Sequence, residues 1–225
     1  MLEAALAADR RRLGDAHEST LVSMAQLGEL LRDLGELPDA EGLLRECYSG
    51  RQASLGPDHP DTLRAKSLLA YTLHLRGKHD EGERLMGEAL AVQRELLRDT
   101  NTDTILTMGM TGDVFTRRGQ PDAALRLTSE ALRLARGSLA NDAIGLGRVT
   151  AQHGLALADA RRNDEAKLVL QEAYSLMEQS GVTAHPDARR VAARLADLYE
   201  RSNADAESTD LARAWRAKSL PRTKP

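Results

Sequence analysis

The residues of this sequence best suited to metal chemistry are its six histidines. Three of them recur at multiples of 42 residues: His17, His59 and His185. A fold that repeats at this interval would place these three on successive turns, far from one another. His153 stands where leucine stands elsewhere in the pattern, which predicts a packing role, and His74 and His79 have no cysteine or clustered carboxylate at ligand spacing. We therefore expect neither a metal site nor a cofactor.

The sequence also gives little support for a catalytic site. Four glutamates recur at the same interval: Glu46, Glu88, Glu130 and Glu172. Acids one repeat apart cannot form a close general-acid and general-base pair, so we expect them to bond into a neighbouring turn. The stretch at 145–147, Gly-Leu-Gly, lacks the third glycine, the preceding strand and the G-K-[ST] sequence of a phosphate loop. Cys47, the only cysteine, takes a position that alanine holds elsewhere, which predicts a packing residue. The sequence therefore predicts no enzyme.

The period of 42 residues is kept by three sets of small residues. The first set precedes a bulky residue: Cys47, Ala89, Ala131 and Ala173. The second set lies seven residues earlier: Ala40, Gly82, Ala124 and Ala166. The third set lies twelve residues before the second: Gly28, Ala70, Gly112 and Gly154. Such phase-locked self-similarity indicates a stacked array, in which each unit buries its apolar face against its neighbours.

Each period is predicted to contain two helices. The first carries an apolar face at helical spacing, which in the second period consists of Leu63, Leu69, Ala70 and Leu73. A glycine turn at Gly77 ends it, and a second helix follows. Asp58 and Thr100, in the linkers between periods, are the expected helix N-caps. The predicted fold is all-α, a right-handed superhelix of tandem antiparallel helix pairs that form one continuous solenoid.

The phase of the repeat also predicts the boundaries along the chain. Residues 1–12 are in phase with the second helix of a truncated repeat, so the chain opens in the middle of a unit. Four units of 42 residues fill 13–180, a degenerate helix pair follows at 181–219, and 220–225 is the expected disordered tail. An uncapped half-repeat suggests missing sequence upstream. It also leaves an apolar flank through which two copies could self-associate.

Composition excludes several kinds of partner. Hydrophobic residues make up 41% of the chain but aromatic residues only 3%, a balance that suits closely packed helices better than a sheet. The 31 basic and 34 acidic residues are mixed along the whole length, so no basic stripe points to nucleic acid. No run of 18 apolar residues points to a membrane. A single cysteine permits no internal disulfide, which favours a reducing, cytoplasmic setting.

The small residues at the eighth, twentieth and twenty-seventh positions of a unit, Ala70, Gly82 and Ala89 in the second, resemble the tetratricopeptide repeat. The period and the linker Leu-Gly-Pro-Asp-His-Pro-Asp-Thr-Leu at 55–63 are similar to the longer variant found in kinesin light chains and many bacterial regulatory proteins. This resemblance covers nearly the whole chain. It implies a scaffold for binding other proteins, and it does not name the ligand.

The resemblance also implies where a ligand would bind, because first helices line the concave face of tetratricopeptide arrays. Carried onto this sequence, their exposed positions give a predicted peptide-binding groove: Arg32, Arg64, Ser67, Tyr71, His74, Asp113, Arg117 and Arg148. Thr116 and Leu155 hold exposed positions of the same kind. The expected partner is an extended or helical segment of a protein, and the arginines are compatible with an acidic one.

Two alternatives stay open at this point. Residues 211–220 resemble the end of repeat regions that follow a protein kinase domain in some bacterial signalling proteins. The chain would then be a regulatory or substrate-recruiting C-terminal region, although it contains no H-R-D or D-F-G sequence itself. The second alternative is a structural module that assembles with its own copies through 1–12.

Overall fold

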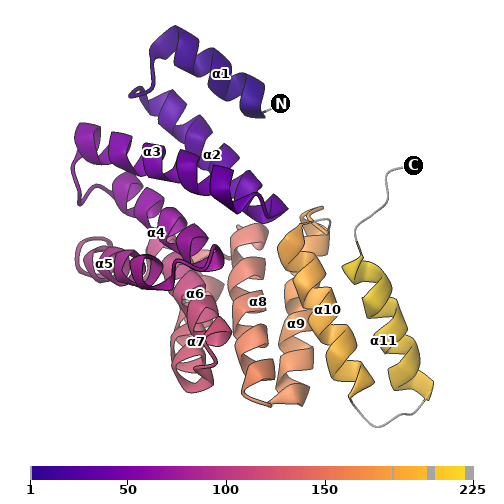
Figure 1. Cartoon of the computed structure of the whole chain (residues 1–225). Helices are drawn as coiled ribbons and strands as arrows, with labels where there is room; N and C mark the ends of the chain where they lie inside the picture. The colour runs from indigo at the N-terminus through magenta and orange to yellow at the C-terminus, as the bar shows by residue number, and fades with distance from the viewer. Residues whose placement is uncertain (1, 184, 202–205, 221–225) are drawn as a thin grey trace. The chain divides into compact units, whose positions relative to one another are not determined.

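The computed structural model describes residues 2–183, 185–201 and 206–220, and these residues form eleven α-helices and no strand (Figure 1). The helices, in chain order, are α1 (Leu2–Leu13), α2 (Glu18–Leu34), α3 (Leu37–Leu55), α4 (Pro60–Leu75), α5 (His79–Leu97), α6 (Thr102–Arg117), α7 (Pro121–Ser138), α8 (Ala143–Asp159), α9 (Asn163–Gln179), α10 (Pro186–Glu200) and α11 (Ala206–Ser219). The predicted all-α fold of helix pairs is confirmed. Most of the expected tail at 220–225 lies outside the described residues.

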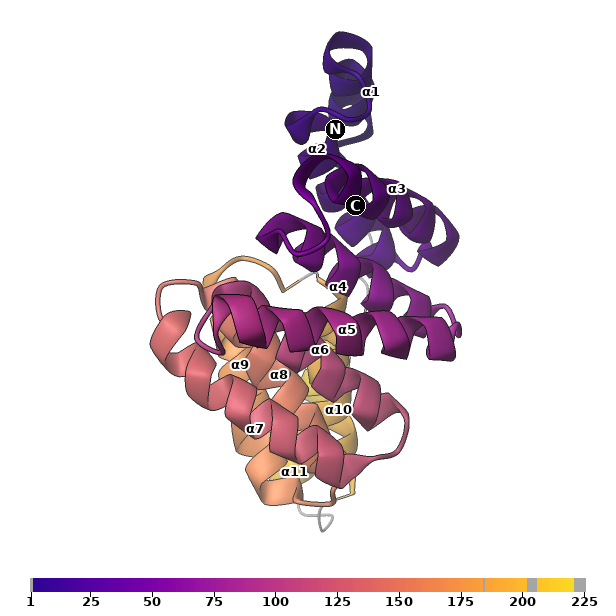
Figure 2. The ribbon, with the colours of Figure 1, turned by 90° about the vertical axis from the view of Figure 1, so that its left-hand side faces the viewer.

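The helices divide between two compact units, Met1–Asp99 with α1 to α5 and Thr100–Pro225 with α6 to α11. Within the first unit, α4 packs against both helices of the pair before it, α2 and α3. Within the second, α8 packs in the same way against α6 and α7, and α10 against α8 and α9 (Figure 2). The sequence gives no sign of this division, because the 42-residue period passes through it unchanged.

The small residues that mark the period let paired helices approach closely. The residues at the first two sets of positions are buried, and Cys47, Ala89, Ala131 and Ala173 are all fully covered. At the third set, a Cβ on Gly28 would lie 2.7 Å from Leu44, and one on Gly154 would lie 2.7 Å from Leu170. The first and fourth repeats therefore use the absent side chain on their first helix to seat a leucine of their second helix.

Several first helices begin at a histidine cap that the sequence analysis missed. The backbone N–H of Ser19, Asp61 and Asp187 each donates to the Nδ1 atom of the histidine two residues earlier, at 3.2 Å. The expectation of Asp58 as the cap of α4 was wrong, because His59 occupies that position. Thr100 was likewise wrong for α6, where the side chain of Asn101 accepts the N–H of Asp103 at 2.9 Å. The shared position of the histidines thus reflects helix capping.

Two of the four recurrent glutamates join successive second helices, as predicted, whereas Glu88 pairs with Lys66 and Arg84 inside its own repeat. Glu46 on α3 pairs with Arg10 on α1, and Glu172 on α9 pairs with Arg136 on α7 at 3.0 Å. Both arginines lie 36 residues before their glutamate, so one contact is used twice. The side chains are partly exposed, which limits each pair to about 1 kcal/mol or less. Their role is structural.

Glu41 on α3 forms a buried centre of charge in the first unit. Its carboxylate pairs with Arg45 at 3.1 Å and Lys78 at 2.8 Å, and also with Arg76. Burial by itself would raise the pKa of the Glu41 carboxyl, but hydrogen bonds from these cations outweigh it and lower the pKa to about 2. Because Arg76 and Lys78 flank the turn between α4 and α5, this carboxylate fixes that turn to the preceding pair.

Candidate functional site

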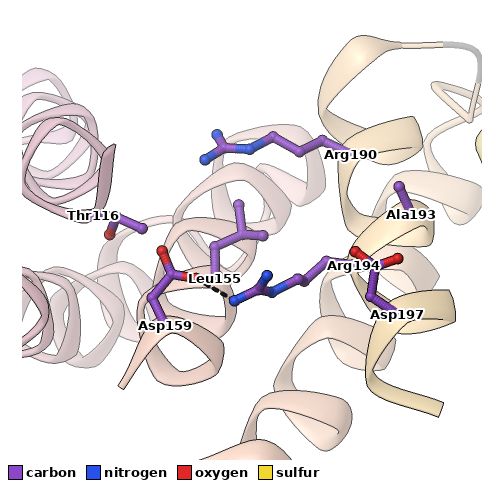
Figure 3. A pocket seen from close by; sticks show the side chains of 7 residues that line it. All are labelled: Thr116, Leu155, Asp159, Arg190, Ala193, Arg194 and Asp197. Carbon is purple, nitrogen blue, oxygen red and sulfur yellow. Dashed lines mark hydrogen bonds and ion pairs between the residues drawn. The ribbon is translucent and has the colours of Figure 1, made fainter. Parts of the chain in front are cut away.

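The second unit contains an open hollow on the side formed by its first helices. Its volume is about 260 Å³. Figure 3 shows its lining, which comes from α6, α8 and α10: Thr116, Leu155, Asp159, Arg190, Ala193, Arg194 and Asp197. The four residues from α10 follow the spacing i, i+3, i+4, i+7 of one helix face. Leu155 and Ala193 supply apolar surface between charged side chains.

One end of the hollow is lined by a cation, Arg190, that is held by a buried carboxylate behind it. The Asp113 carboxylate on α6 is fully buried and pairs with both Arg117 and Arg190, each at 2.7 Å. Burial by itself would raise the pKa of the Asp113 carboxyl, but the two guanidinium charges outweigh it and lower the pKa to about 2. Two cations therefore share one anion, and Arg190 is the member of this group that lines the hollow.

The other end has the opposite balance. Arg216 on α11 pairs with Asp197 at 2.7 Å and with Glu200 at 2.9 Å, so one cation is shared by two anions. Asp197 is the member that lines the hollow. Between the two ends, Arg194 and Asp159 face one another across the hollow and form an ion pair (Figure 3). The lining thus runs from positive at Arg190 to negative at Asp197.

The structure corrects the exposure expected for the predicted groove in the first unit. Arg32, Ser67, Tyr71 and His74 were expected to be exposed and are buried, with exposed fractions of 8% or less. The Arg32 guanidinium lies 5.6 Å from the centre of the Tyr71 ring and bonds to Asp33. The Ser67 hydroxyl donates to the Leu63 carbonyl of its own helix. Only Arg64 presents an exposed side chain, and it pairs with Glu29 on α2 at 3.5 Å.

His74, the last of these, lies against His79 at the turn between α4 and α5, with 3.2 Å between the two Nδ1 atoms. Glu83 is the nearest acid, 4.0 Å from His74. Within the described part of the chain, no group of three or more His, Cys, Asp or Glu side chains is arranged to hold a metal ion. Two adjacent imidazoles can share a hydrogen bond, and burial of one of them makes this contact a packing feature.

In the second unit, the predicted set overlaps the hollow only in part. Asp113 was expected to be exposed and is buried, and Arg117 reaches the hollow only through it. Arg148 bonds to Asp187 at 3.2 Å at the start of α10. Thr116 and Leu155, from the wider set of groove positions, do line the hollow.

The contribution of α10 is missing from the predicted groove because the sequence analysis predicts a degenerate fifth helix pair. Extending the period by 42 residues from Arg148 and Leu155 gives Arg190 and Asp197. The same repeat that predicted the groove therefore contained the signal for its missing side.

Cys47 and His153 have packing roles, as predicted. The Cys47 thiol donates to the Leu21 carbonyl at 3.3 Å, and burial raises its pKa, which keeps the reactive thiolate from forming. His153 is half-buried and shares a hydrogen bond with Thr128 at 3.0 Å. Among the described helices, none has the length and apolar character that a membrane crossing needs.

These features define a class of protein: an all-α array of tandem helix pairs, with a hollow between first helices of its second unit. Two family models, both described as tetratricopeptide repeat, match residues 20–61 and 61–137, which together make up more than half of the sequence. The chain belongs to the tetratricopeptide-repeat family. Proteins with this repeat generally mediate interactions between proteins.

Solved structures give the same result for the fold. BtubC (BKLC) from P. vanneervenii matches with a TM-score of 0.69 and 19% identity, covering 100% of this chain and 96% of that one. The nearly identical TPR-like repeats assigned to a kinesin light chain of Podosopora anserina match with a TM-score of 0.63 and 20% identity, covering 92% and 99%. No curated protein matches the sequence. At these identities the likeness shows a kinesin-light-chain-like fold and nothing of the ligand.

Proposed function

We propose that the chain is a protein-interaction scaffold that holds a peptide segment of its partner in the hollow between α6, α8 and α10. The observation that carries this proposal is the combination of an apolar floor at Leu155 with charged side chains on both sides. Peptide sites in proteins commonly combine apolar contact area with a few polar groups that fix orientation. Of the predicted groove residues in the first unit, only Arg64 has an exposed side chain, so we assign the ligand to the second unit.

The size of the hollow favours an extended segment. An α-helix with its side chains is about 10 Å wide, whereas a hollow of about 260 Å³ holds only a few side chains. An extended segment can place alternate side chains into it and leave the rest in solvent. The proposed ligand is therefore a short linear stretch of another protein.

A displayed library of random peptides would test this function. Ala193 lines the hollow and is half-buried, so Ala193→Tyr should fill the hollow without removing a core side chain. The matched control is Ala53→Tyr at an exposed position of α3. We expect the unmodified chain and the control to enrich the same peptides and Ala193→Tyr to enrich none of them. Equal enrichment by all three proteins would place binding elsewhere.

Two alternative functions from the sequence remain as separate proposals. The resemblance of 211–220 to a kinase-associated terminus supports a regulatory role, and the described part of this stretch forms the end of α11. A kinase domain encoded in frame upstream and purified as one chain with these repeats would support that role.

Self-assembly through α1 is supported by an open cavity bounded by α1, α2 and α3, with Leu6 and Leu31 among its lining residues. Sedimentation velocity over a range of concentrations tests it.

A further inference from the structure

The hollow between α6, α8 and α10 is electrically polar along its length, and this polarity specifies a ligand. Its lining contains two arginines and two aspartates, so it is neutral as a whole. Ion pairs between lining residues and residues behind them make the two ends of the hollow differ in charge. At one end, Arg190 and Arg117 both pair with the buried Asp113; at the other end, Asp197 and Glu200 both pair with Arg216.

The distance between the two ends of the hollow sets how many residues of a bound peptide separate its two charged side chains. Asp197 lies seven residues after Arg190 on α10, which corresponds to about 10 Å along the helix axis. In an extended peptide, alternate side chains face the same way, and two such steps cover about 13 Å. The flexible stem of a lysine or arginine takes up the difference.

Extending the proposed function, we propose that the hollow recognises an extended segment of the form acidic–x–apolar–x–basic, in either chain direction. The acidic side chain lies at Arg190, the apolar side chain lies on Leu155 and Ala193, and the basic side chain lies at Asp197. The Arg194–Asp159 pair, which is neutral, borders the middle position. Charge complementarity at both ends and apolar contact between them select this class of ligand.

The distances and burial of these groups support the assignment. Asp113 is fully buried, so it holds the Arg190 side chain at the hollow without itself being open to a ligand. The Arg190 side chain is 31% exposed, and guanidinium has five N–H donors, which allows a second carboxylate to bind beside Asp113. The Asp197 side chain is 37% exposed.

Four labelled peptides test the proposal by fluorescence polarisation: Glu-Ser-Leu-Ser-Lys within glycine–serine flanks, and versions with glutamine replacing the acidic residue, the basic residue or both. We expect the doubly charged peptide to bind about fivefold more tightly than either singly charged one. The reversed sequence is no control, because it can bind in the opposite chain direction. Salt should reduce the difference between the peptides.

Variants of the hollow assign each charge to its end. With Asp197→Asn, the advantage of the lysine should disappear and that of the glutamate should remain. With Arg190→Gln, the reverse is expected. Asp210→Asn and Arg213→Gln, at exposed positions of α11, are the matched controls and should bind as the unmodified chain does. Combining each protein variant with each peptide gives a double-mutant cycle, which isolates the contribution of each charge pair to binding.

The possible results separate this proposal from the one on which it rests. If all four peptides bind equally and Ala193→Tyr abolishes that binding, the peptide site stands and the charge preference is wrong. If none binds in the millimolar range, both proposals are wrong. Arg190→Gln removes one of the cations paired with the buried Asp113 and can weaken folding, so circular dichroism must accompany it. Should that variant unfold, the Asp197→Asn result decides by itself.

Discussion

At the residue scale, the repeat contains two arginines at positions where other units use glycine. Arg161 lies 42 residues after Gly119 and adopts a φ of 62°, in the left-handed region that Gly35, Gly77 and Gly119 also occupy. Arg98 lies 42 residues after Gly56 and has a φ of 69°. Residues that carry a Cβ atom, unlike glycine, are strained in this region by about 1–2 kcal/mol. The fold therefore imposes its turn geometry even where the sequence has lost the residue best suited to it.

Replacing Arg161 with glycine should stabilise the second unit. Its side chain is exposed, so few contacts are lost, and relief of strain exceeds the added entropy of glycine in the unfolded chain. We expect Arg161→Gly to raise the free energy of unfolding by about 0.5–1 kcal/mol in urea titration. Arg118→Gly, where φ is −83°, relieves no strain and should lower it. A loss of stability in both variants would mean that the Arg161 side chain contributes more than its geometry costs.

At the element scale, α5 contains two glycines with opposite roles. A Cβ on Gly82 would lie 2.8 Å from the Ala70 carbonyl oxygen and 2.9 Å from the His74 backbone nitrogen, so α4 and α5 could not keep their distance. A Cβ on Gly87 would meet nothing within 4 Å. Gly82 is therefore required by packing, whereas Gly87 is an exposed helix position where glycine only lowers helix propensity.

Alanine at each of these positions should change stability in opposite directions. Gly87→Ala should raise the free energy of unfolding by about 1 kcal/mol. Gly82→Ala should lower it by about 2 kcal/mol or more, because backbone atoms cannot move aside as flexible side chains can. Thermal unfolding followed by circular dichroism measures both. Equal effects would contradict the close approach of α4 and α5.

The histidine cap of α4 gives a second test at this scale. His59→Ala removes the acceptor for the Asp61 N–H and should cost about 1 kcal/mol, whereas His59→Asn should retain the stability. Gln120→Ala is the control, because Gln120 precedes α7 without a side-chain cap. Urea titration of the three variants compares them. A similar loss for His59→Ala and His59→Asn would exclude capping as the reason for this histidine.

The helices were predictable from the sequence because their small residues and apolar faces are local and periodic. The exposure of the groove positions was not, because it depends on neighbours in other repeats. Tyr71 is covered by Arg32 from the preceding repeat. Asp113 is covered by Arg190, which lies 77 residues further along the chain. A pattern read within one repeat assigns Tyr71 and Asp113 to the surface, and only the stacked structure shows which longer side chains cover them.

At the scale of the whole molecule, the described part of each compact unit contains one buried carboxylate held by several cations. Glu41 serves the first unit and Asp113 the second, and both carboxyl groups have a pKa of about 2. Removing one partner of a buried pair leaves uncompensated charge, so such groups stabilise a fold only while they are ionised. Stability of both units is thereby linked to pH.

The linkage predicts a loss of stability in acid. The pKa of each carboxyl is lower in the folded chain than its ordinary value of 4.5 for Glu41 or 3.8 for Asp113, so the unfolded chain binds protons first. The stabilisation is complete above these ordinary values and declines as pH falls toward about 2. We expect the double variant Glu41→Gln, Asp113→Asn to be less stable at pH 7 and to lose less further stability between pH 5 and pH 2.

Asp164→Asn is the control for this titration, because its side chain is 98% exposed and should leave the acid dependence unchanged. Urea titration at successive pH values gives the slope, and hydrogen exchange locates the loss. Because an array is stabilised mainly by contacts between neighbouring repeats, Glu41→Gln should increase exchange in α3 to α5, and Asp113→Asn in α6 to α10. A double variant as sensitive to acid as the unmodified chain would show that other carboxylates control its response to pH.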